Sequence, residues 1–318
     1  MRATDLLSFL CAAVAALGNA FANVMQRKAS LEQDPGSDFG MHVLAALIRR
    51  RTWLLGFAGM VASFLLQAVA LGLGQLSAVE PIITLEVPLT LLVAGRVFGT
   101  RLARAEWLSI LAMTFGMIAL VASLDPRPGD EAHVSNLMYV VAGGGTAATI
   151  LILVAFGARG PRLMRTACLG AAAGTCFGFT ATLIKETVSR LSADGLVGVL
   201  TTWQTYAAVS FGLLGVLVMQ WALHTGPLLA SQPGFTLMDP IVSVLWGVLV
   251  FNEVTRTGPW LILSVAGTAV LALGVLMLAR SPLLAAVNES EGPVRPADAG
   301  TRRGGGAALD TAPLPGRH

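Results

Sequence analysis

The sequence predicts an all-α fold, that of a polytopic membrane protein, from its composition and the spacing of its apolar stretches. Of the 318 residues, 55% are hydrophobic and only 12% are charged, whereas charged residues make up about 25% of a typical soluble domain. A soluble protein of this composition would expose large apolar patches to water. The composition therefore excludes an ordinary soluble enzyme, an intrinsically disordered protein and a nucleic-acid-binding protein.

About nine stretches are long and apolar enough to cross a bilayer as helices, which takes about 20 residues each. They are residues 5–26, 52–73, 77–96, 105–124, 136–156, 163–185, 199–222, 229–252 and 259–280. The short apolar segment 41–48 ends at three arginines and is expected to lie at the membrane surface. Residues 281–318 are rich in Pro, Gly, Ala and Arg. They are expected to form a disordered cytoplasmic tail after a transmembrane domain of residues 1–280.

Positive charges in the short loops predict the orientation of these spans. Lys and Arg are concentrated in the loops that follow the first, third and fifth spans, and they are sparse in the loops between. We therefore expect a multi-pass protein of the cytoplasmic membrane, with its N-terminus outside and its C-terminus inside. The tripeptide Ala20-Phe21-Ala22 resembles a signal-peptide cleavage site, but the eight spans that follow favour an uncleaved first helix.

An internal repeat links the two ends of the predicted membrane domain. Residues 70–88 and 222–240 share nine identical positions out of nineteen without a gap. Because matching spans lie five apart along the chain, the two copies must cross the membrane in opposite directions. This predicts inverted repeats over about residues 5–124 and 163–280, with the span 136–156 between them, which is typical of secondary transporters. A duplication retained only for helix packing is the alternative.

Charged side chains in the middle of a span are candidates for function, because placing a charge in lipid is costly. Glu86 lies near the middle of the third span and Asp239 near the middle of the eighth, while Glu80 lies nearer the outer end of the third. We expect Glu86 and Asp239 to line a transport cavity. Proline removes a backbone donor and breaks helices, so two breaks are expected in each copy, at Pro81, Pro88, Pro233 and Pro240.

At the second of these breaks in the eighth span, Asp239 is predicted to cap a restarted helix that has Pro240 at its first position. A carboxylate beside freed backbone groups could bind a cation or a proton. The alternative is that Glu86 and Asp239 each only cap a broken helix.

Further polar side chains within the spans are candidates for binding the substrate or ion. Asn19, Asn23 and Gln26 share one face of the first span, and Lys185 ends the sixth span in the place that Gln26 holds in the first. The alternatives are hydrogen bonds between helices for the Asn face, and extension of Lys185 to the membrane surface. The remaining predicted site residues are Gln67 in the second span and Gln220 in the seventh.

Motifs in both copies resemble the drug/metabolite transporter superfamily. In the second copy these are Gly226-Pro227, Ala230-Ser231-Gln232-Pro233, Asp239-Pro240 and Gly247, and in the first copy the segment from Gln67 to Pro88. Gly18-Asn19 and Gln26-Arg27-Lys28 narrow the resemblance to its EamA-like and NIPA-like branch with nine spans. The resemblance implies a 4+1+4 helical bundle, a central cavity near mid-membrane and gradient-driven movement of small solutes. It also marks the position of Lys185 as a recurrent polar one.

Transport of a small organic solute, driven by a gradient of protons or another ion, is therefore the function that the sequence favours. The first alternative is a divalent-cation transporter of the NIPA type, although Mg²⁺ prefers more oxygen ligands than these few acids supply. A non-transporting membrane scaffold or receptor is the second. The expected partners are the small-molecule or ion substrate and the lipid bilayer, with a homodimer left open and no nucleic acid.

Motifs for other chemistry are missing from the sequence. The glycine run 143–145 lacks the Lys and Ser/Thr of a phosphate loop. The four histidines are scattered and show no metal-ligand spacing. We therefore predict neither an enzyme nor a cofactor, and no dedicated metal site.

Overall fold

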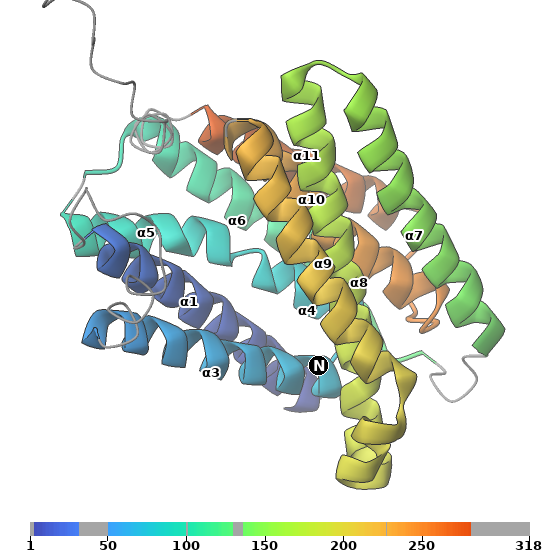
Figure 1. The fold of residues 1–318 in the computed structure, drawn as a ribbon. Helices are drawn as coiled ribbons and strands as arrows, with labels where there is room; N and C mark the ends of the chain where they lie inside the picture. Colours follow the sequence, from blue (N-terminus) through green and yellow to red (C-terminus); the bar gives the residue numbers. More distant parts are fainter. Residues whose placement is uncertain (1–2, 32–49, 100, 130–135, 227, 281–318) are drawn as a thin grey trace, which may run out of the picture.

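The structure is a computed structural model that describes residues 3–31, 50–99, 101–129, 136–226 and 228–280. These residues form a bundle of helices (Figure 1). Among them there is no strand, only an isolated bridge between Arg127 and Val254. The all-α prediction is confirmed for this part of the chain. The predicted surface segment 41–48 and the predicted tail 281–318 lie outside the described residues.

The bundle contains ten helices within the described ranges. They are α1 (Ala3–Leu31), α3 (Arg51–Leu73), α4 (Leu76–Ile83), α5 (Glu86–Phe98), α6 (Arg104–Leu124), α7 (Asn136–Arg159), α8 (Arg162–Thr201), α9 (Trp203–Thr225), α10 (Leu228–Leu249) and α11 (Pro259–Ala279). Eight helices are long and apolar enough to cross a membrane, with α4 and α5 counted as one continuous span. The protein therefore has the helices of a polytopic membrane protein. Helix α10 has 22 residues but is not among those eight, so a ninth span stays a prediction.

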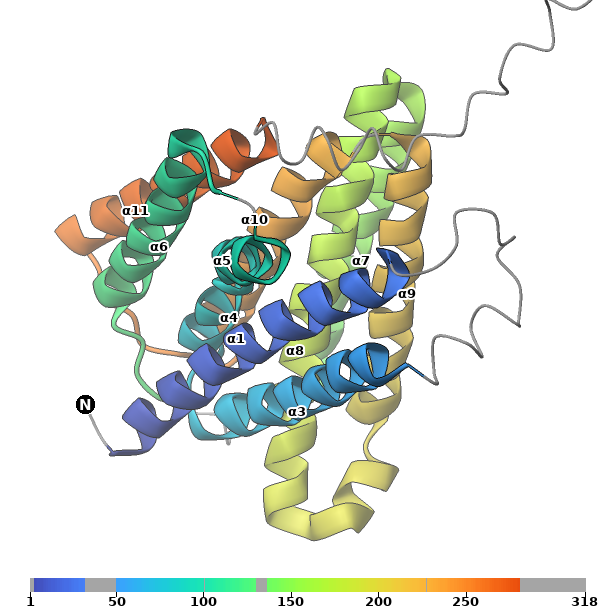
Figure 2. The ribbon, with the colours of Figure 1, turned by 90° about the vertical axis from the view of Figure 1, so that its left-hand side faces the viewer.

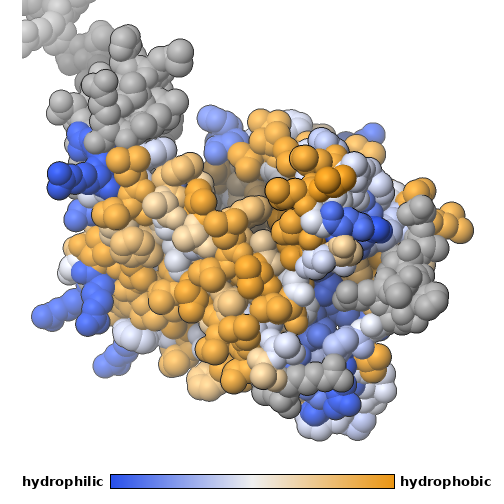
Figure 3. Space-filling model, turned by 90° about the horizontal axis from the view of Figure 1, so that it is seen from below, coloured by the Kyte–Doolittle hydropathy of each residue, from blue (hydrophilic) through white to orange (hydrophobic). Residues whose placement is uncertain are grey.

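Apolar side chains cover much of the outside of the bundle. Ile262 and Leu196 are each 74% exposed, and Leu137 is 72% exposed. Figure 3 shows one face on which apolar residues occupy the middle while hydrophilic residues gather toward the edges. Exposing such a surface to water would cost free energy and favour aggregation, whereas lipid chains solvate it at little cost.

Four close helix pairings organise the bundle, and glycines allow the close approach in three of them. Helix α1 packs along α3, α8 packs along α9 and α10, and α6 packs along α11, as Figure 2 shows from the side. A Cβ atom added at Gly56 would meet α1, one added at Gly116 would meet the α11 backbone, and one added at Gly174 would meet the α10 backbone. Small residues at these positions let the helix backbones approach, as is common in membranes.

The third predicted span is interrupted once, between α4 and α5. Thr84 and Leu85 keep right-handed helical angles, but the hydrogen bonds tighten to a spacing of three residues. The Leu85 amide donates to the Ile82 carbonyl over 3.0 Å, and the Val87 amide donates to the Thr84 carbonyl over 3.2 Å. Pro81 lies inside α4 and Pro88 inside α5. The predicted pair of breaks is therefore wrong here: a single break lies between the two prolines.

Helix α10 is continuous, which corrects the prediction for the second copy. Pro233 and Pro240 both lie inside the helix Leu228–Leu249. Asp239 is thus a residue of the helix interior and does not cap a restarted helix. Proline is tolerated inside membrane helices where neighbouring helices support the backbone, and α8 packs along α10 through Gly170, Gly174 and Gly178.

Helix α8 runs well past the end of the predicted sixth span at residue 185. It has 40 residues and continues to Thr201, with a bend at Gly195, whose φ of 65° lies in the left-handed region that favours glycine. This extension forms the lower end of the molecule in Figure 1.

Candidate functional site

A cavity of about 530 Å³ lies between α1, α3, α4, α5, α8, α9 and α10. Three carboxyl groups, two amides and a hydroxyl supply its polar lining. These belong to Glu80, Glu86 and Asp239, to Asn19 and Gln67, and to Thr180. Four of the eight residues that we predicted to bind substrate or ion therefore line one cavity: Asn19, Gln67, Glu86 and Asp239.

Glu80 also lines this cavity, next to the break between α4 and α5. It is only 2% exposed, and the Gln67 amide on α3 donates a hydrogen bond to its Oε1 over 2.9 Å. On an unbroken helix, Glu80 and Glu86 would lie about 120° apart around the helix axis, which is why the sequence does not indicate a shared site. The tightened turn at Thr84 and Leu85 allows both acids to line the same cavity.

Glu86 begins α5 and is held by α1. The Asn19 side chain hydrogen-bonds to its carboxyl group. Glu86 and Glu80 also interact electrostatically. The two carboxyl groups therefore line the same cavity, and each interacts with an amide from the α1–α3 pair.

Asp239 supplies the third carboxyl group from α10. It interacts electrostatically with both Glu80 and Glu86. Its buried Oδ1 atom has no hydrogen-bond partner among the described residues, and neither does the buried Ser243 hydroxyl one turn further along α10. A buried polar atom without a partner is costly, so Asp239 lines the cavity with one carboxyl oxygen left uncompensated behind it.

The rest of the cavity wall is apolar. Phe177 on α8 and Phe235 on α10 meet edge to face, with ring centroids 5.6 Å apart, and both line the cavity. Ile83, Ala208 and Leu213 continue this wall. Among the described residues that line the cavity there is neither Lys nor Arg. The site therefore combines an acidic polar face with an aromatic and aliphatic one.

The other four predicted site residues, which are Asn23, Gln26, Gln220 and Lys185, do not line this cavity. Asn23 is exposed, and Gln26 is half-buried against α3, where its amide is 3.9 Å from the Met60 sulfur. Asn19 and Gln26 do share a helix face, but seven residues advance a helix by roughly 10 Å, which places Gln26 beyond the cavity. Gln220 is exposed on α9.

Lys185 lies in a buried cluster that the sequence did not indicate. It is 5% exposed, and its ammonium group donates to the Gly74 carbonyl over 2.7 Å. It also lies 3.7 Å from Oε1 of Glu253, which is itself 3% exposed. Glu253 accepts hydrogen bonds from the Leu76 amide over 2.6 Å and the Ser77 amide over 3.0 Å, and another from the Ser77 hydroxyl.

This cluster corrects the alternative in which Lys185 extends to the membrane surface. Glu253 caps the N-terminus of α4, where unpaired amides favour a negative charge. The cluster joins α8, the turn between α3 and α4, and the segment after α10. Glu253 follows α10 in a stretch without a recognisable motif, so only its contacts mark it.

The described residues contain no group of three or more His, Cys, Asp or Glu side chains arranged to hold a metal ion. The three carboxyl groups share a cavity but do not form such a group. The arrangement can accept positive charge from a ligand larger than a single metal ion, and it can also take up protons.

Comparison with known proteins adds one relative. No family model matches the chain, and no solved structure matches it. An uncharacterized protein of Corynebacterium glutamicum is 29% identical over 262 residues, which cover 81% of this chain and 89% of that protein. Its name states no activity, so the function has to be argued from the cavity itself.

Proposed function

We propose that the protein is a secondary transporter that moves a small solute by alternating access and couples this movement to protons or another ion. The observation that carries the proposal is the single cavity that receives carboxyl groups from α4, α5 and α10. Those helices contain the two copies of the sequence repeat. An inverted repeat around a central site is the arrangement by which transporters expose that site to either side in turn.

Helix packing supports two related halves. The α1–α3 pair in the first half corresponds to the α8–α9 pair in the second, and α6 and α11, which correspond to each other, pack together. In our proposal the halves cover about residues 5–124 and 163–280, and α7 lies between them. A ninth span, the 4+1+4 bundle and membership of the drug/metabolite transporter superfamily are parts of this proposal.

Coupling follows from the charge of the cavity. Three carboxylates that interact in a poorly hydrated site repel one another, because the effective dielectric constant there is far below that of water. A proton or another cation relieves that repulsion. If the substrate and the coupling ion compete for the same carboxyl groups, the gradient of one drives the movement of the other.

The Lys185–Glu253 cluster is the proposed closure on one side. It joins the start of α4, which carries Glu80, to α8 and to the segment after α10. Opening the cavity toward that side requires these contacts to rearrange. We place this side outside the cell, in accordance with the predicted orientation in the cytoplasmic membrane.

A divalent-cation transporter is the second candidate, favoured by three acids in one cavity. It is ranked lower because the acids are not gathered into a metal-binding group within the described residues. Mg²⁺ demands near-octahedral oxygen coordination at short distances, which acids that form no metal-binding group do not supply.

Reconstitution into liposomes tests the proposal. A panel of organic solutes and divalent metals is added with and without an imposed pH gradient, while solute uptake and internal pH are recorded. We expect gradient-dependent uptake that Glu86→Gln and Asp239→Asn each reduce at least about tenfold, because each removes a charge that the transport cycle uses. Asp194→Asn, an equal change of charge on an exposed residue, is the control.

Three results contradict the proposal or change its ranking. Wild-type rates in both cavity variants exclude the coupling role of the acids. The absence of any transported solute favours a scaffold. Uptake of Mg²⁺ without proton movement promotes the second candidate.

A further inference from the structure

We propose that the central cavity binds an amphiphilic organic cation, which enters from the membrane between α3 and α9. This inference rests on the proposed function, because it names the substrate class of the same site. It depends on the charge of the cavity lining, on its size and aromatic wall, and on the exposure of one edge of it.

The lining selects for positive charge. Glu80, Glu86 and Asp239 face one cavity that no described Lys or Arg lines. The Gln67 and Asn19 amides each already donate to a carboxyl group. An anion would be repelled by the three acids, and a neutral solute would leave the repulsion of Asp239 by Glu80 and Glu86 unrelieved. A cation supplies what these groups lack.

The size and wall of the cavity select for an organic cation. A volume of about 530 Å³ falls in the range of small-molecule sites, roughly 300–1,000 Å³, and is far larger than a metal ion needs. The rings of Phe177 and Phe235 meet edge to face on the wall. Aromatic rings attract cations that pass over their faces and shield the apolar body of a ligand.

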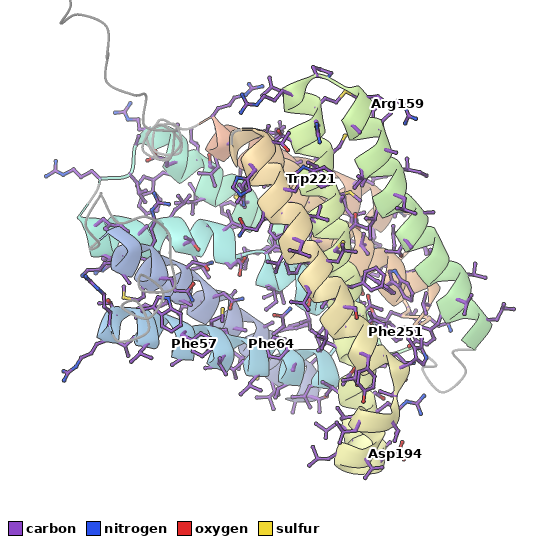
Figure 4. The ribbon with its side chains drawn as sticks, in the orientation of Figure 1. Phe57, Phe64, Arg159, Asp194, Trp221 and Phe251 are labelled. Carbon is purple, nitrogen blue, oxygen red and sulfur yellow. The ribbon has the colours of Figure 1, made fainter. Side chains whose placement is uncertain are left out.

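One edge of the cavity is formed by apolar residues that are exposed on the outside of the bundle. Among the residues that line the cavity, Phe64 on α3 is 51% exposed, and Val209 and Leu213 on α9 are 60% and 61% exposed. Helix α3 packs on α1 and α8 rather than on α9, and Phe64 lies on the α3 surface labelled in Figure 4. The cavity is thus bordered by side chains on the apolar surface of the bundle.

This edge favours a ligand that dissolves in the bilayer. Its exposed side chains are apolar, so a hydrated ion would have to lose its water shell to pass them. An amphiphilic cation instead partitions into the membrane and reaches the edge at a raised local concentration. The acids inside then bind the charge, and the aromatic wall binds the apolar body.

Binding of tetraphenylphosphonium to the full chain in lipid nanodiscs tests the inference. We expect saturable binding that Asp239→Asn and Glu86→Gln each weaken at least about tenfold, since each removes one partner of a desolvated charge pair. Asp194→Asn should bind as the wild type does. Tetraphenylborate has the same shape with the opposite charge and should not compete. Size-exclusion and melting profiles establish which variants are folded.

Entry of the ligand between α3 and α9 is tested separately, by its rate of association. Val209→Trp fills the edge of the cavity, whereas Leu217→Trp places the same side chain elsewhere on α9, at a residue that is 66% exposed and does not line the cavity. We expect Val209→Trp to slow association of tetraphenylphosphonium several-fold while Leu217→Trp leaves it unchanged. Equal association rates for the two variants would overturn the lateral route.

The outcomes separate this inference from transport itself. If tetraphenylborate binds as well as tetraphenylphosphonium, or if both acid variants bind normally, the cation site is refuted. If an anionic or neutral solute is transported in a Glu86-dependent way and tetraphenylphosphonium neither binds nor competes, transport stands and this inference fails. If tetraphenylphosphonium binds but no solute crosses liposomes, the inference stands and the proposed transport fails.

Discussion

Single residues in this protein carry charges that the bilayer would otherwise exclude. Glu80 and Lys185 are both nearly fully buried, but their surroundings compensate their charges to different extents. Glu80 has one amide donor and faces a cavity, whereas Lys185 has a carbonyl and a carboxylate within reach. The charge of Lys185 is compensated within the fold, whereas in our proposal a ligand supplies the compensation that Glu80 lacks.

Removal of Lys185 should therefore cost stability. Lys185→Met leaves Glu253 buried without its cation, and breaking such a pair typically costs about 3–5 kcal/mol. We expect a large drop in melting temperature in detergent. Arg190→Met, which breaks the half-exposed pair with Glu186, should lower it little because exposed pairs contribute at most about 1 kcal/mol.

The double variant Lys185→Met/Glu253→Gln checks the cause. Neutralising the stranded carboxylate should restore part of the lost stability, because Gln still offers an oxygen to the α4 amides. Equal melting temperatures for the two single variants, Lys185→Met and Arg190→Met, would show that the cluster is not a structural tie.

Ser243 provides a second test at this scale. Its hydroxyl is buried one turn from Asp239 and has no partner among the described residues. Replacing it by Ala removes an unsatisfied polar group, so we expect Ser243→Ala to leave stability unchanged or to raise it slightly. A drop in melting temperature of the size seen for Lys185→Met would mean that Ser243 makes a contact not apparent in this conformation.

At the scale of elements, the contact between α8 and α10 depends on the absence of side chains. A Cβ at Gly174 would come within 2.4 Å of the Phe235 carbonyl oxygen. That distance is too short for any real contact, so Gly174→Ala forces the two helices apart. Such overpacking typically costs about 1–3 kcal/mol.

A matched control exists on α7. A Cβ at Gly144 would meet nothing within 4 Å, so Gly144→Ala should be neutral or slightly stabilising, because alanine favours helices over glycine by about 0.5–1 kcal/mol. Melting temperatures of the two variants in detergent provide the measurement. If Gly174→Ala melted with or above Gly144→Ala, the close approach of α8 and α10 would be refuted.

The two similar segments, residues 70–88 and 222–240, show where prediction from local sequence ends. Both have prolines seven residues apart, yet α4 and α5 are separated by a break and α10 is a continuous helix. Helix α10 packs along α8 over most of its length, while α4 contacts α10 and α5 contacts α1. The difference between the two segments goes with different neighbouring helices, which the local sequence does not indicate.

At the scale of the whole molecule, the predicted orientation can be tested with two labelled positions. Arg159 at the end of α7 and Asp194 in the extension of α8 are both exposed, and they lie at opposite ends of the bundle (Figure 4). In a cysteine-free background, Asp194→Cys should react with a membrane-impermeant maleimide on intact cells. Arg159→Cys should react only after permeabilisation. The reverse pattern would place the N-terminus inside.

The sequence by itself determined the class of this protein and most of the helix positions. Apolar stretches of membrane-spanning length are a property of the local chain, because each must satisfy its own backbone groups in lipid. Eight such helices follow directly. The cost of a charge in lipid also made Glu86 and Asp239 candidates without any knowledge of their neighbours.

Only the tertiary structure decided which polar residues meet. The break at Thr84 and Leu85 brings Glu80 to the same cavity as Glu86, the length of α1 separates Gln26 from it, and Glu253 reaches Lys185 from a distant segment. These contacts depend on helix packing between residues far apart in the chain. Local sequence patterns report the faces of one helix, whereas a shared site requires the relative depth and rotation of several.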